Sequence, residues 1–214
     1  MPDTIVFLDC ALSSMLCAHK LMDDSDETTV HMVTDGFEVG MYGETPGILP
    51  LTMWPLARPH WLSETGFRHP EEGDTAIRSS WMKKSMAISL ATRGAHFHTG
   101  TRTCTNNRDE RSLALSYPGS KTSTKISYDH IVEKDARDLP SWNGAIVTEL
   151  PSWSCVSGKR PDGTFEVWWQ GEDHPISPLQ VMQWRGLDPT TALESHASLA
   201  DAKLANIKNE RLAT

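Results

Sequence analysis

The sequence has little of what would send a protein to a membrane or out of the cell. No apolar run approaches the roughly 20 residues that a transmembrane helix requires, so we expect no membrane association. The start of the chain carries the acidic Asp3 where a secretory signal would carry positive charge, so export is not expected. The cysteines form neither a CxxC pair nor a zinc-binding spacing, which predicts reduced thiols in a cytoplasmic protein. They are Cys10, Cys17, Cys104 and Cys155.

Positive charge is also scarce. The chain has 20 Lys and Arg residues against 28 Asp and Glu residues, a formal net charge of −8. Such a surface disfavours electrostatic binding to nucleic acid or to anionic lipid. The 214 residues, 38% of them hydrophobic, are enough for one substantial core. We therefore predict a single domain over residues 1–214.

Glycine is missing from the first turn of the chain. The apolar run Thr4–Leu8 predicts a strand, Met15–Met22 a helix and Glu27–Val33 a second strand. Strand, turn, helix and strand in that order make a βαβ unit, the opening of a dinucleotide-binding fold. The connecting turn, Asp9–Ser14, contains no glycine, although a turn that holds phosphates normally needs several.

Proline and tryptophan are concentrated in residues 45–75. Such an insertion forms neither helix nor strand for long. It could be a lid over a pocket or a surface ordered by a protein partner, and its lack of catalytic groups favours the partner. A helix is expected next, over about Thr75–Arg93, with Gly94 placed to cap its C-terminus.

From Ala95 the pattern changes to short strands separated by turns. We predict an antiparallel β-meander over about residues 95–133, whose last strand is Lys125–Val132. Further along, the turn Pro161–Gly163 is expected to pair Ser154–Val156 with Thr164–Trp169. The remaining expected elements are a strand over Trp142–Leu150 and a helix over about Thr191–Leu212.

Several stretches match the pattern of a known family. Ile5–Leu21 matches a strand, turn and helix that hold a diphosphate, and Ala91–Phe97 matches a helix-to-strand junction. Asp129–Arg137 matches a strand that returns to the cofactor, and Gly40–Gly47 and Val167–Leu193 are weaker matches. The chain thereby resembles FAD-dependent monooxygenases and their relatives, the flavin-dependent halogenases and geranylgeranyl reductases. This resemblance implies an α/β fold of the FAD/NAD(P)-binding, Rossmann-like type, with a mainly parallel sheet, flanking helices and an antiparallel β-meander.

The resemblance also implies where FAD would lie. Asp9, Ala11 and Ser14 stand at the three glycine positions of the family's Gly-x-Gly-x-x-Gly turn, with Leu12 and Ser13 between the last two. An Asp9 carboxylate beside two phosphates would repel them by about 1 kcal/mol or more per charge pair. The other implied cofactor-binding positions are Gly43 and Glu44 in a halogenase-like loop, Arg137 at the end of the returning strand, and Asp173 near the ribityl chain.

Two further departures fall on the same implied site. Met32 and Val33 stand where the second strand usually ends in a ribose-binding acid, and neither can accept that hydrogen bond. Of the family's Ala-x-Gly-Arg segment, only Arg137 is matched. We therefore expect an eroded dinucleotide site, with weak or no FAD binding and a non-catalytic role in a homo-oligomer or with another protein partner. The alternative is a small active FAD-dependent oxidoreductase of the monooxygenase or halogenase type.

Other candidate residues have plainer interpretations. His96 and His98 share one strand face and could ligate a metal, but a third ligand is not evident and a solvated strand face is favoured. Asp173 beside His174 could act as an acid–base pair or simply belong to a polar turn. Cys104 has no neighbouring histidine that would make it a nucleophile.

Overall fold

The computed structural model describes residues 3–40, 45–49, 53–64, 67–101, 103–120, 122–134 and 138–212. The chain divides into two compact units. Unit 1 comprises Met1–Met41, Ala87–Ala136 and Ser198–Thr214, and unit 2 comprises Tyr42–Met86 and Arg137–Ala197. The expectation that residues 1–214 act as a single domain stays a prediction.

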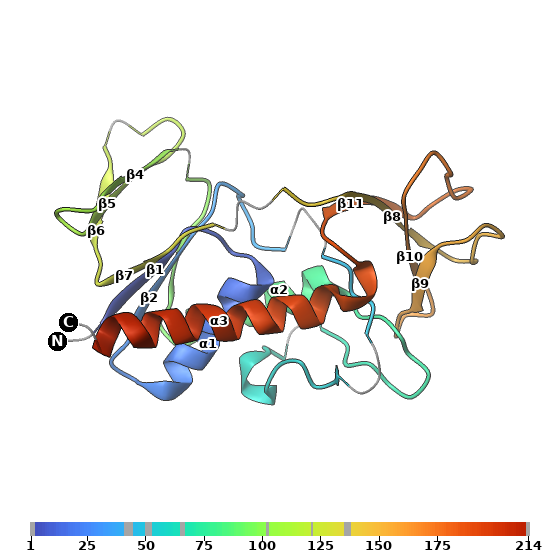
Figure 1. Ribbon diagram of the computed structural model, residues 1–214, viewed down its shortest axis with the longest axis horizontal. Coiled ribbons are helices and arrows are strands. Elements are labelled where there is room, and N and C mark those ends of the chain that lie inside the picture. Colours follow the sequence, from blue (N-terminus) through green and yellow to red (C-terminus); the bar gives the residue numbers. More distant parts are fainter. Residues whose placement is uncertain are drawn as a thin grey trace. The chain divides into compact units, whose positions relative to one another are not determined.

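Unit 1 is built on a four-stranded parallel sheet in the order β3-β2-β1-β7 (Figure 1). The central β1 (Thr4–Phe7) lies between β2 (Thr29–Val33) and β7 (His130–Val132), and β3 (His96–His98) pairs with β2. The helix α1 (Leu12–Asp24) connects β1 to β2, so the predicted βαβ unit is confirmed. The strand order reverses at β1, and open α/β sheets bind their ligands at the carboxyl ends of strands at such a point.

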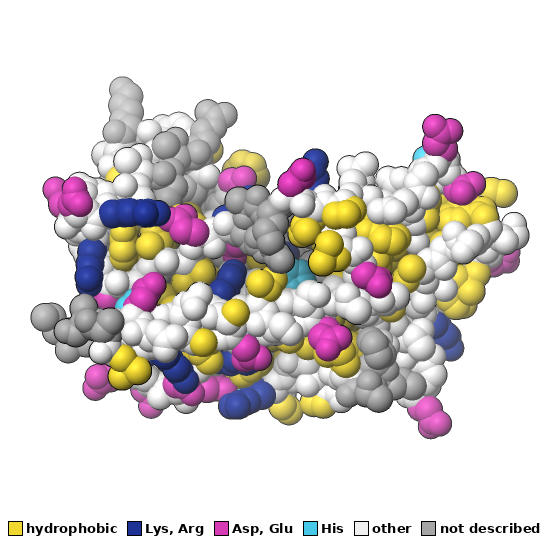
Figure 2. Space-filling model, viewed as in Figure 1, with side chains coloured by type: hydrophobic (Ala, Val, Ile, Leu, Met, Phe, Trp, Pro, Cys, Tyr) yellow, Lys and Arg dark blue, Asp and Glu magenta, His cyan; other side chains and the backbone are white. Residues whose placement is uncertain are grey.

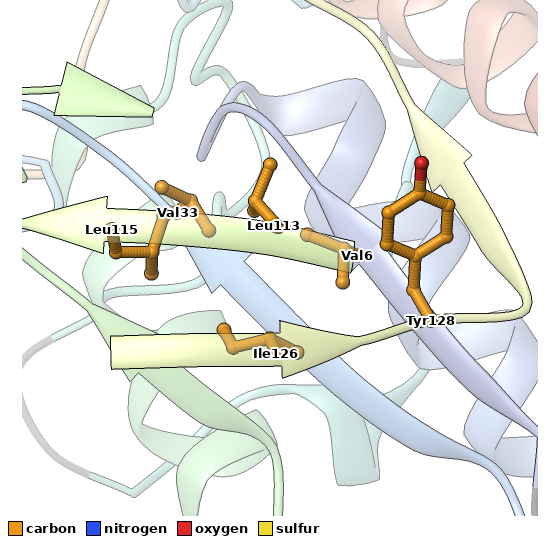
Figure 3. Packing of buried hydrophobic residues seen from close by; sticks show 6 residues of the cluster. All are labelled: Val6, Val33, Leu113, Leu115, Ile126 and Tyr128. Atoms are coloured by element: carbon orange, nitrogen blue, oxygen red, sulfur yellow. The ribbon is translucent and has the colours of Figure 1, made fainter. Parts of the chain in front are cut away.

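Both faces of this parallel sheet are buried. Ile5 and Phe7 have no exposed surface and, by strand alternation, share the face that α1 covers (Figure 1). Val6 points to the opposite face and packs with Val33 against side chains of an antiparallel sheet. Figure 3 shows this cluster, whose other labelled members are Leu113, Leu115, Ile126 and Tyr128.

That antiparallel sheet is the expected meander, but it is shorter than 95–133. It consists of β4 (Thr103–Asn107), β5 (Ser112–Ser116) and β6 (Thr124–Ser127) in sequence order. The segments at either end of the predicted range, β3 and β7, belong to the parallel sheet instead. The chain changes partner at two residues: the Tyr128 N–H donates to the Arg111 carbonyl, and the Asp129 N–H donates to the Thr4 carbonyl. The continuous strand predicted to end at Val132 is therefore two strands.

Unit 2 contains a second antiparallel sheet, in the order β11-β8-β10-β9. Its strands are β8 (Ser141–Val147), β9 (Val156–Lys159), β10 (Phe165–Trp169) and β11 (Gln180–Arg185). The β9–β10 hairpin confirms the pairing expected around Pro161–Gly163. Two tryptophans bury opposite faces of this sheet. Trp168 packs with Ile48, Ala76, Ile146 and Met182, and Trp169 packs with Ala145, Val147 and Val167.

A charged pair is buried inside unit 2. Glu166 has no exposed surface and Arg160 is only 2% exposed. The Glu166 carboxylate accepts hydrogen bonds from Arg160 Nε at 3.0 Å, Gly47 N at 2.7 Å and Trp168 Nε1 at 2.7 Å. Burial raises the pKa of the Glu166 carboxyl, and the Arg160 guanidinium opposes that rise. Because donors from several segments meet on this one carboxylate, it joins the β9–β10 hairpin to residues 45–49.

The described part of the Pro- and Trp-rich segment 45–75 contributes several apolar side chains to the interior of unit 2. Leu49 and Trp61 are almost fully buried. Gly47 lies so close to Ile77 that a Cβ atom there would stand 1.9 Å from the Ile77 carbonyl oxygen, so only glycine fits. The described part of the segment contains only short pieces of regular structure, among them the 3₁₀ helix η2 (Pro59–Trp61) and a bridge from Ile48 to Ala76, as its composition predicts.

Two helices remain. The helix α2 (Ser79–Thr92) begins later than the predicted Thr75, because Thr75 and Ala76 both donate backbone hydrogen bonds to the Lys159 carbonyl. A short 3₁₀ helix, η3 (Pro189–Thr191), leads into α3 (Ala192–Leu212). Within unit 1, α3 lies beside α1 and is tied to it by ion pairs from Lys20 to Asp201 and from Lys208 to Asp24. None of the described helices is long and apolar enough to cross a membrane.

Candidate functional site

The candidate site is the turn from β1 into α1, at the carboxyl end of the parallel sheet. Ala11 is the N-cap residue of α1, and its side chain offers no hydrogen bond to the free N–H groups of the first helical turn. The positive end of the helix dipole therefore needs a negative group from elsewhere. In a nucleotide-binding protein that group is a phosphate.

In this chain the Asp9 carboxylate lies at the start of the helix. Its Oδ1 atom accepts a hydrogen bond from the Ala11 N–H at 3.0 Å and from the Ser14 hydroxyl at 2.5 Å. A half-buried carboxylate with two donors, one of them in the first turn of α1, is electrostatically favourable at that position. Asp9, Ala11 and Ser14, which the sequence brought to attention as substitutes for glycine, thus form one hydrogen-bonded group.

A lysine from the far end of the chain completes this group. Lys203, on α3, places its Nζ atom 2.7 Å from the Ser14 hydroxyl oxygen and 3.4 Å from that of Ser13. Ser14 is fully buried and Ser13 is 3% exposed, so both hydroxyls depend on protein partners rather than on water. Ser14 therefore accepts from Lys203 and donates to Asp9, linking a cation to an anion. Of the named turn residues, Leu12 adds only a buried apolar side chain.

Sequence reasoning did not find Lys203. It lies 189 residues from Ser14, on the helix predicted over about Thr191–Leu212, which no motif connected with the turn. A signal was nevertheless present, since two adjacent serines inside a mostly buried helix need hydrogen-bond partners.

The end of β2 offers no hydrogen-bonding side chain at the implied ribose position. Met32 has no exposed surface and Val33 is 4% exposed, both as parts of the core. Of the other implied cofactor positions, Gly43, Glu44 and Arg137 lie outside the described residues. Asp173 is exposed in the β10–β11 connection of unit 2, and its cofactor role stays a prediction.

Three histidines stack on one face of the parallel sheet. The ring of His31, on β2, lies 4.8 Å from that of His96 and 5.3 Å from that of His98, centroid to centroid. His31 Nδ1 lies 3.0 Å from His98 Nε2, and His98 Nδ1 lies 3.1 Å from the Tyr117 hydroxyl. His31 is thus the third histidine that the sequence did not associate with His96 and His98.

This histidine stack is not arranged as a metal site. Stacked rings direct their nitrogen lone pairs side by side rather than towards one point. Over the residues that the structure describes, no group of three or more His, Cys, Asp or Glu side chains could hold a metal ion. Burial, followed by the neighbouring His98 and His96, lowers the pKa of His31 to about 4, and burial also lowers the pKa of His98. Both rings are therefore neutral at physiological pH.

Two of the described cysteines, Cys17 and Cys155, have thiols that do not ionise readily. Burial raises the pKa of the Cys17 thiol to about 12 and also raises that of Cys155. A thiol with a raised pKa is a poor nucleophile. The side chain of Cys104 lies outside the described part of the chain.

A hollow of about 460 Å³ lies at the amino ends of the parallel strands, and the turn lies at their carboxyl ends. It is lined by Asp3, Thr28 and Asp129, the residues that immediately precede β1, β2 and β7. Arg211 also lines it and pairs with Asp3 at 2.5 Å. The hollow is therefore at the amino ends of the strands, away from the edge where such sheets bind dinucleotides.

Comparison with known proteins bears on the fold. No model of a protein family matches the sequence, and no curated protein does so either. Among solved structures the chain is similar to BexE, which was studied for oxidation during BE-7585A biosynthesis, at 12% identity and a TM-score of 0.58 over 94% of this chain and 63% of BexE.

Two further solved structures are similar to the chain. CabE, an aromatic hydroxylase from angucycline biosynthesis, matches at 12% identity and a TM-score of 0.53 over 86% of this chain and 52% of CabE. A flavoprotein/dehydrogenase from Cytophaga hutchinsonii matches at 9% identity and a TM-score of 0.55 over 97% of this chain and 79% of that protein.

This chain spans less than two thirds of the length of BexE or CabE. At such low identities the likeness concerns the fold alone. It confirms the FAD/NAD(P)-binding α/β fold that the resemblance to FAD-dependent monooxygenases and halogenases implied.

Proposed function

We propose that this chain is a flavoprotein-monooxygenase-like protein with an eroded dinucleotide site, which binds FAD weakly or not at all and serves a non-catalytic, partner-binding role. The observation that carries the proposal is the position of the Asp9 carboxylate. It takes hydrogen bonds from the Ala11 N–H and the Ser14 hydroxyl at the start of α1. The chain supplies its own anion at the point where the fold family holds a diphosphate.

The magnitudes favour exclusion of a diphosphate. The field at a helix N-terminus stabilises an anion by about 0.3–1 kcal/mol when the site is exposed. A second negative charge about 4 Å from Asp9 is opposed by about 1 kcal/mol in water and about 4 kcal/mol at a protein surface. The repulsion from Asp9 therefore matches or exceeds the attraction of the helix N-terminus. The apolar end of β2, at Met32 and Val33, adds no ribose contact that could compensate.

A second candidate function, a small active FAD-dependent oxidoreductase, has one observation in its favour. The Lys203 ammonium lies within hydrogen-bond distance of Ser14, at the start of α1. If Asp9 turned away, this lysine and the helix N-terminus could together hold an anion. The two functions thus differ in whether Asp9 or a phosphate takes the position beside Ser14.

The deciding experiment measures FAD affinity in Asp9→Asn by the quenching of flavin fluorescence. This change keeps the size of the side chain and removes only its charge. Asp26→Asn is the matched control, because Asp26 is an exposed acid of the same unit in the turn after α1. We expect FAD to bind Asp9→Asn at least about tenfold more tightly than either the wild type or the control, a difference of about 1.4 kcal/mol.

Equal affinities in Asp9→Asn and Asp26→Asn would show that Asp9 is not the group that excludes the cofactor. A variant with Asp9→Gly, Ala11→Gly and Ser14→Gly restores the family's turn. If that variant folds and gains no flavin affinity, the derivation of this turn from a nucleotide site is wrong.

A further inference from the structure

Large exposed apolar side chains gather around β11 of unit 2. Leu179, just before the strand, is 62% exposed, and Val181, within it, is 71% exposed. Ile176 and Leu187, on either side, are 95% and 70% exposed. Figure 2 shows hydrophobic side chains over the region that Figure 1 labels β8 and β11. Surfaces of this kind mark sites of association more often than isolated apolar residues do.

The strand itself is an open edge. Over the described residues, β11 pairs with β8 on one side and with no strand on the other. Alternate residues of an edge strand direct their N–H and C=O groups away from the sheet, and only another extended segment can match a whole row of them. The geometry therefore calls for a β-strand, rather than a helix or a lipid surface, as the occupant.

Proteins usually protect such an edge with charge, and the part of β11 that precedes Arg185 lacks that protection. No charged residue occurs from Ile176 to Trp184, in a chain whose formal net charge is −8. Lysines or inward-pointing charges on an edge strand normally prevent pairing with another copy. An uncharged edge on a strongly acidic protein is, by contrast, a place where two copies can meet without opposing carboxylates.

We propose that β11 pairs with β11 of a second copy of this chain, antiparallel about a twofold axis near Val181, so that the two four-stranded sheets become one. By strand alternation, Leu179 and Val181 share one face of β11. An antiparallel pairing near Val181 sets these two side chains beside those of the partner copy, and a twofold interface makes the same contact twice.

A second copy fits this edge better than an unrelated strand does. The symmetric pairing needs no charge on the partner, and β11 has none to offer until Arg185. In a twofold pairing centred at Val181, the paired residues end at Leu179 and Gln183, because Pro178 has no N–H and Ser177 has a positive φ of 51°. Arg185 lies beyond them and meets no like charge. The composition of the Pro- and Trp-rich segment 45–75 suggested that it binds a partner. It is less suited to that role than β11, because its Trp61 and Leu49 are already buried inside unit 2.

This inference names the partner surface for the proposed non-catalytic role and rests on that proposal. Its test is sedimentation of the wild type, of Val181→Lys and of Phe37→Lys over a range of concentrations. Phe37 is the matched control, an apolar side chain of unit 1 that is 76% exposed. We expect a reversible dimer for the wild type and for Phe37→Lys. In Val181→Lys the dissociation constant should rise at least about tenfold, because the twofold axis brings two lysines together.

Hydrogen exchange of the wild type provides a second readout that needs no variant. The amides of β11 should become more protected as the protein concentration rises, while those of the β9 edge should not. A wild type that sediments as a monomer throughout, a dimer that Val181→Lys leaves intact, or β11 amides indifferent to concentration would each overturn the proposal.

The result is separable from the test of the cofactor site. A protein that dimerises through β11 and also takes up FAD would contradict the proposed erosion and leave the interface standing. A monomer that does not bind FAD would contradict the β11 interface and agree with the proposed erosion.

Discussion

His31 shows how a residue with no place in a family motif can set a property of the protein. Its ring lies against those of His96 and His98, and it shares a short nitrogen–nitrogen contact with His98. Its pKa is lowered from 6.5 to about 4, chiefly by burial. Each protonation in the stack would place positive charge beside another imidazole, so the neutral state is part of the fold.

The lowered pKa of His31 predicts a loss of stability in mild acid. Below pH 6.5 the unfolded chain takes up a proton that the folded chain resists until about pH 4, so stability is full above 6.5 and falls between these values. The half-buried ring is partly screened by solvent, so we expect His31 to account for roughly 1 kcal/mol of the decrease. Urea unfolding at a series of pH values measures the effect. It is followed by circular dichroism, because every tryptophan lies in unit 2 and His31 lies in unit 1.

Carboxylates also titrate in this range and contribute to the pH dependence of stability. The contribution of His31 is therefore obtained by comparing the wild type with His31→Asn. This variant should show a flatter pH dependence than the wild type. His174→Asn, at an exposed histidine in the β10–β11 connection, should leave the dependence unchanged. A slope identical in the wild type and in His31→Asn would show that the His31 proton is not linked to folding.

The residues at the candidate site were predictable only in part. Asp9, Ala11 and Ser14 follow from the spacing of the turn, because strand, turn and helix are adjacent in sequence. Lys203 does not, since it reaches Ser14 from a helix near the other end of the chain. The local pattern identifies a helix start with two serines in its first turn, but it does not identify which distant side chain will donate to their hydroxyls.

At the scale of elements, the β9–β10 hairpin depends on the buried pair of Glu166 and Arg160. In Glu166→Ala, Arg160 would remain buried at 2% exposure without its counterion, and the Gly47 and Trp168 N–H groups would lose their acceptor. Removal of one partner of a buried ion pair costs about 3–5 kcal/mol. We expect a loss of that size in the free energy of unfolding, measured by urea denaturation of unit 2's tryptophan signal.

The exposed Glu149, just after β8, provides the control, since Glu149→Ala should change stability by no more than about 0.5 kcal/mol. Replacement of both partners, Arg160→Met with Glu166→Leu, should be less harmful than Glu166→Ala alone, because no buried charge is left. If Glu166→Ala were as mild as Glu149→Ala, the pair would not hold the hairpin in place.

The helices and strands were largely predictable where the local sequence pattern alone decides the structure. Thr4–Leu8 and Glu27–Val33 alternate or run apolar beside a compact helix, and they became β1 and β2. The predictions were wrong where a long-range hydrogen bond decides the outcome. Thr75 and Ala76 are held extended by the Lys159 carbonyl, which delays α2, and the Asp129 N–H turns to Thr4, which moves the following residues into the parallel sheet.

At the scale of the whole molecule, the chain combines a dinucleotide-type fold with a turn that carries its own anion. The buried apolar residues of the sheet and of its first helix, such as Val6 and Leu12, fit the fold. In the proposed account, Asp9 stands at the diphosphate position and the apolar Met32 and Val33 stand at the ribose position. Composition alone drew attention to residues 45–75 as a partner surface. The β11 edge that we propose instead could not be predicted in this way, because the exposure of Leu179 and Val181 depends on the fold.

The central claim is that Asp9 takes the place of a phosphate, and its most direct test is the titration of FAD into the wild-type protein. The account predicts a colourless purified protein and no saturable uptake of FAD, because Ala11 and Ser14 already donate to Asp9. A yellow protein with flavin absorption bands, or stoichiometric FAD binding with a micromolar or tighter dissociation constant, would contradict it.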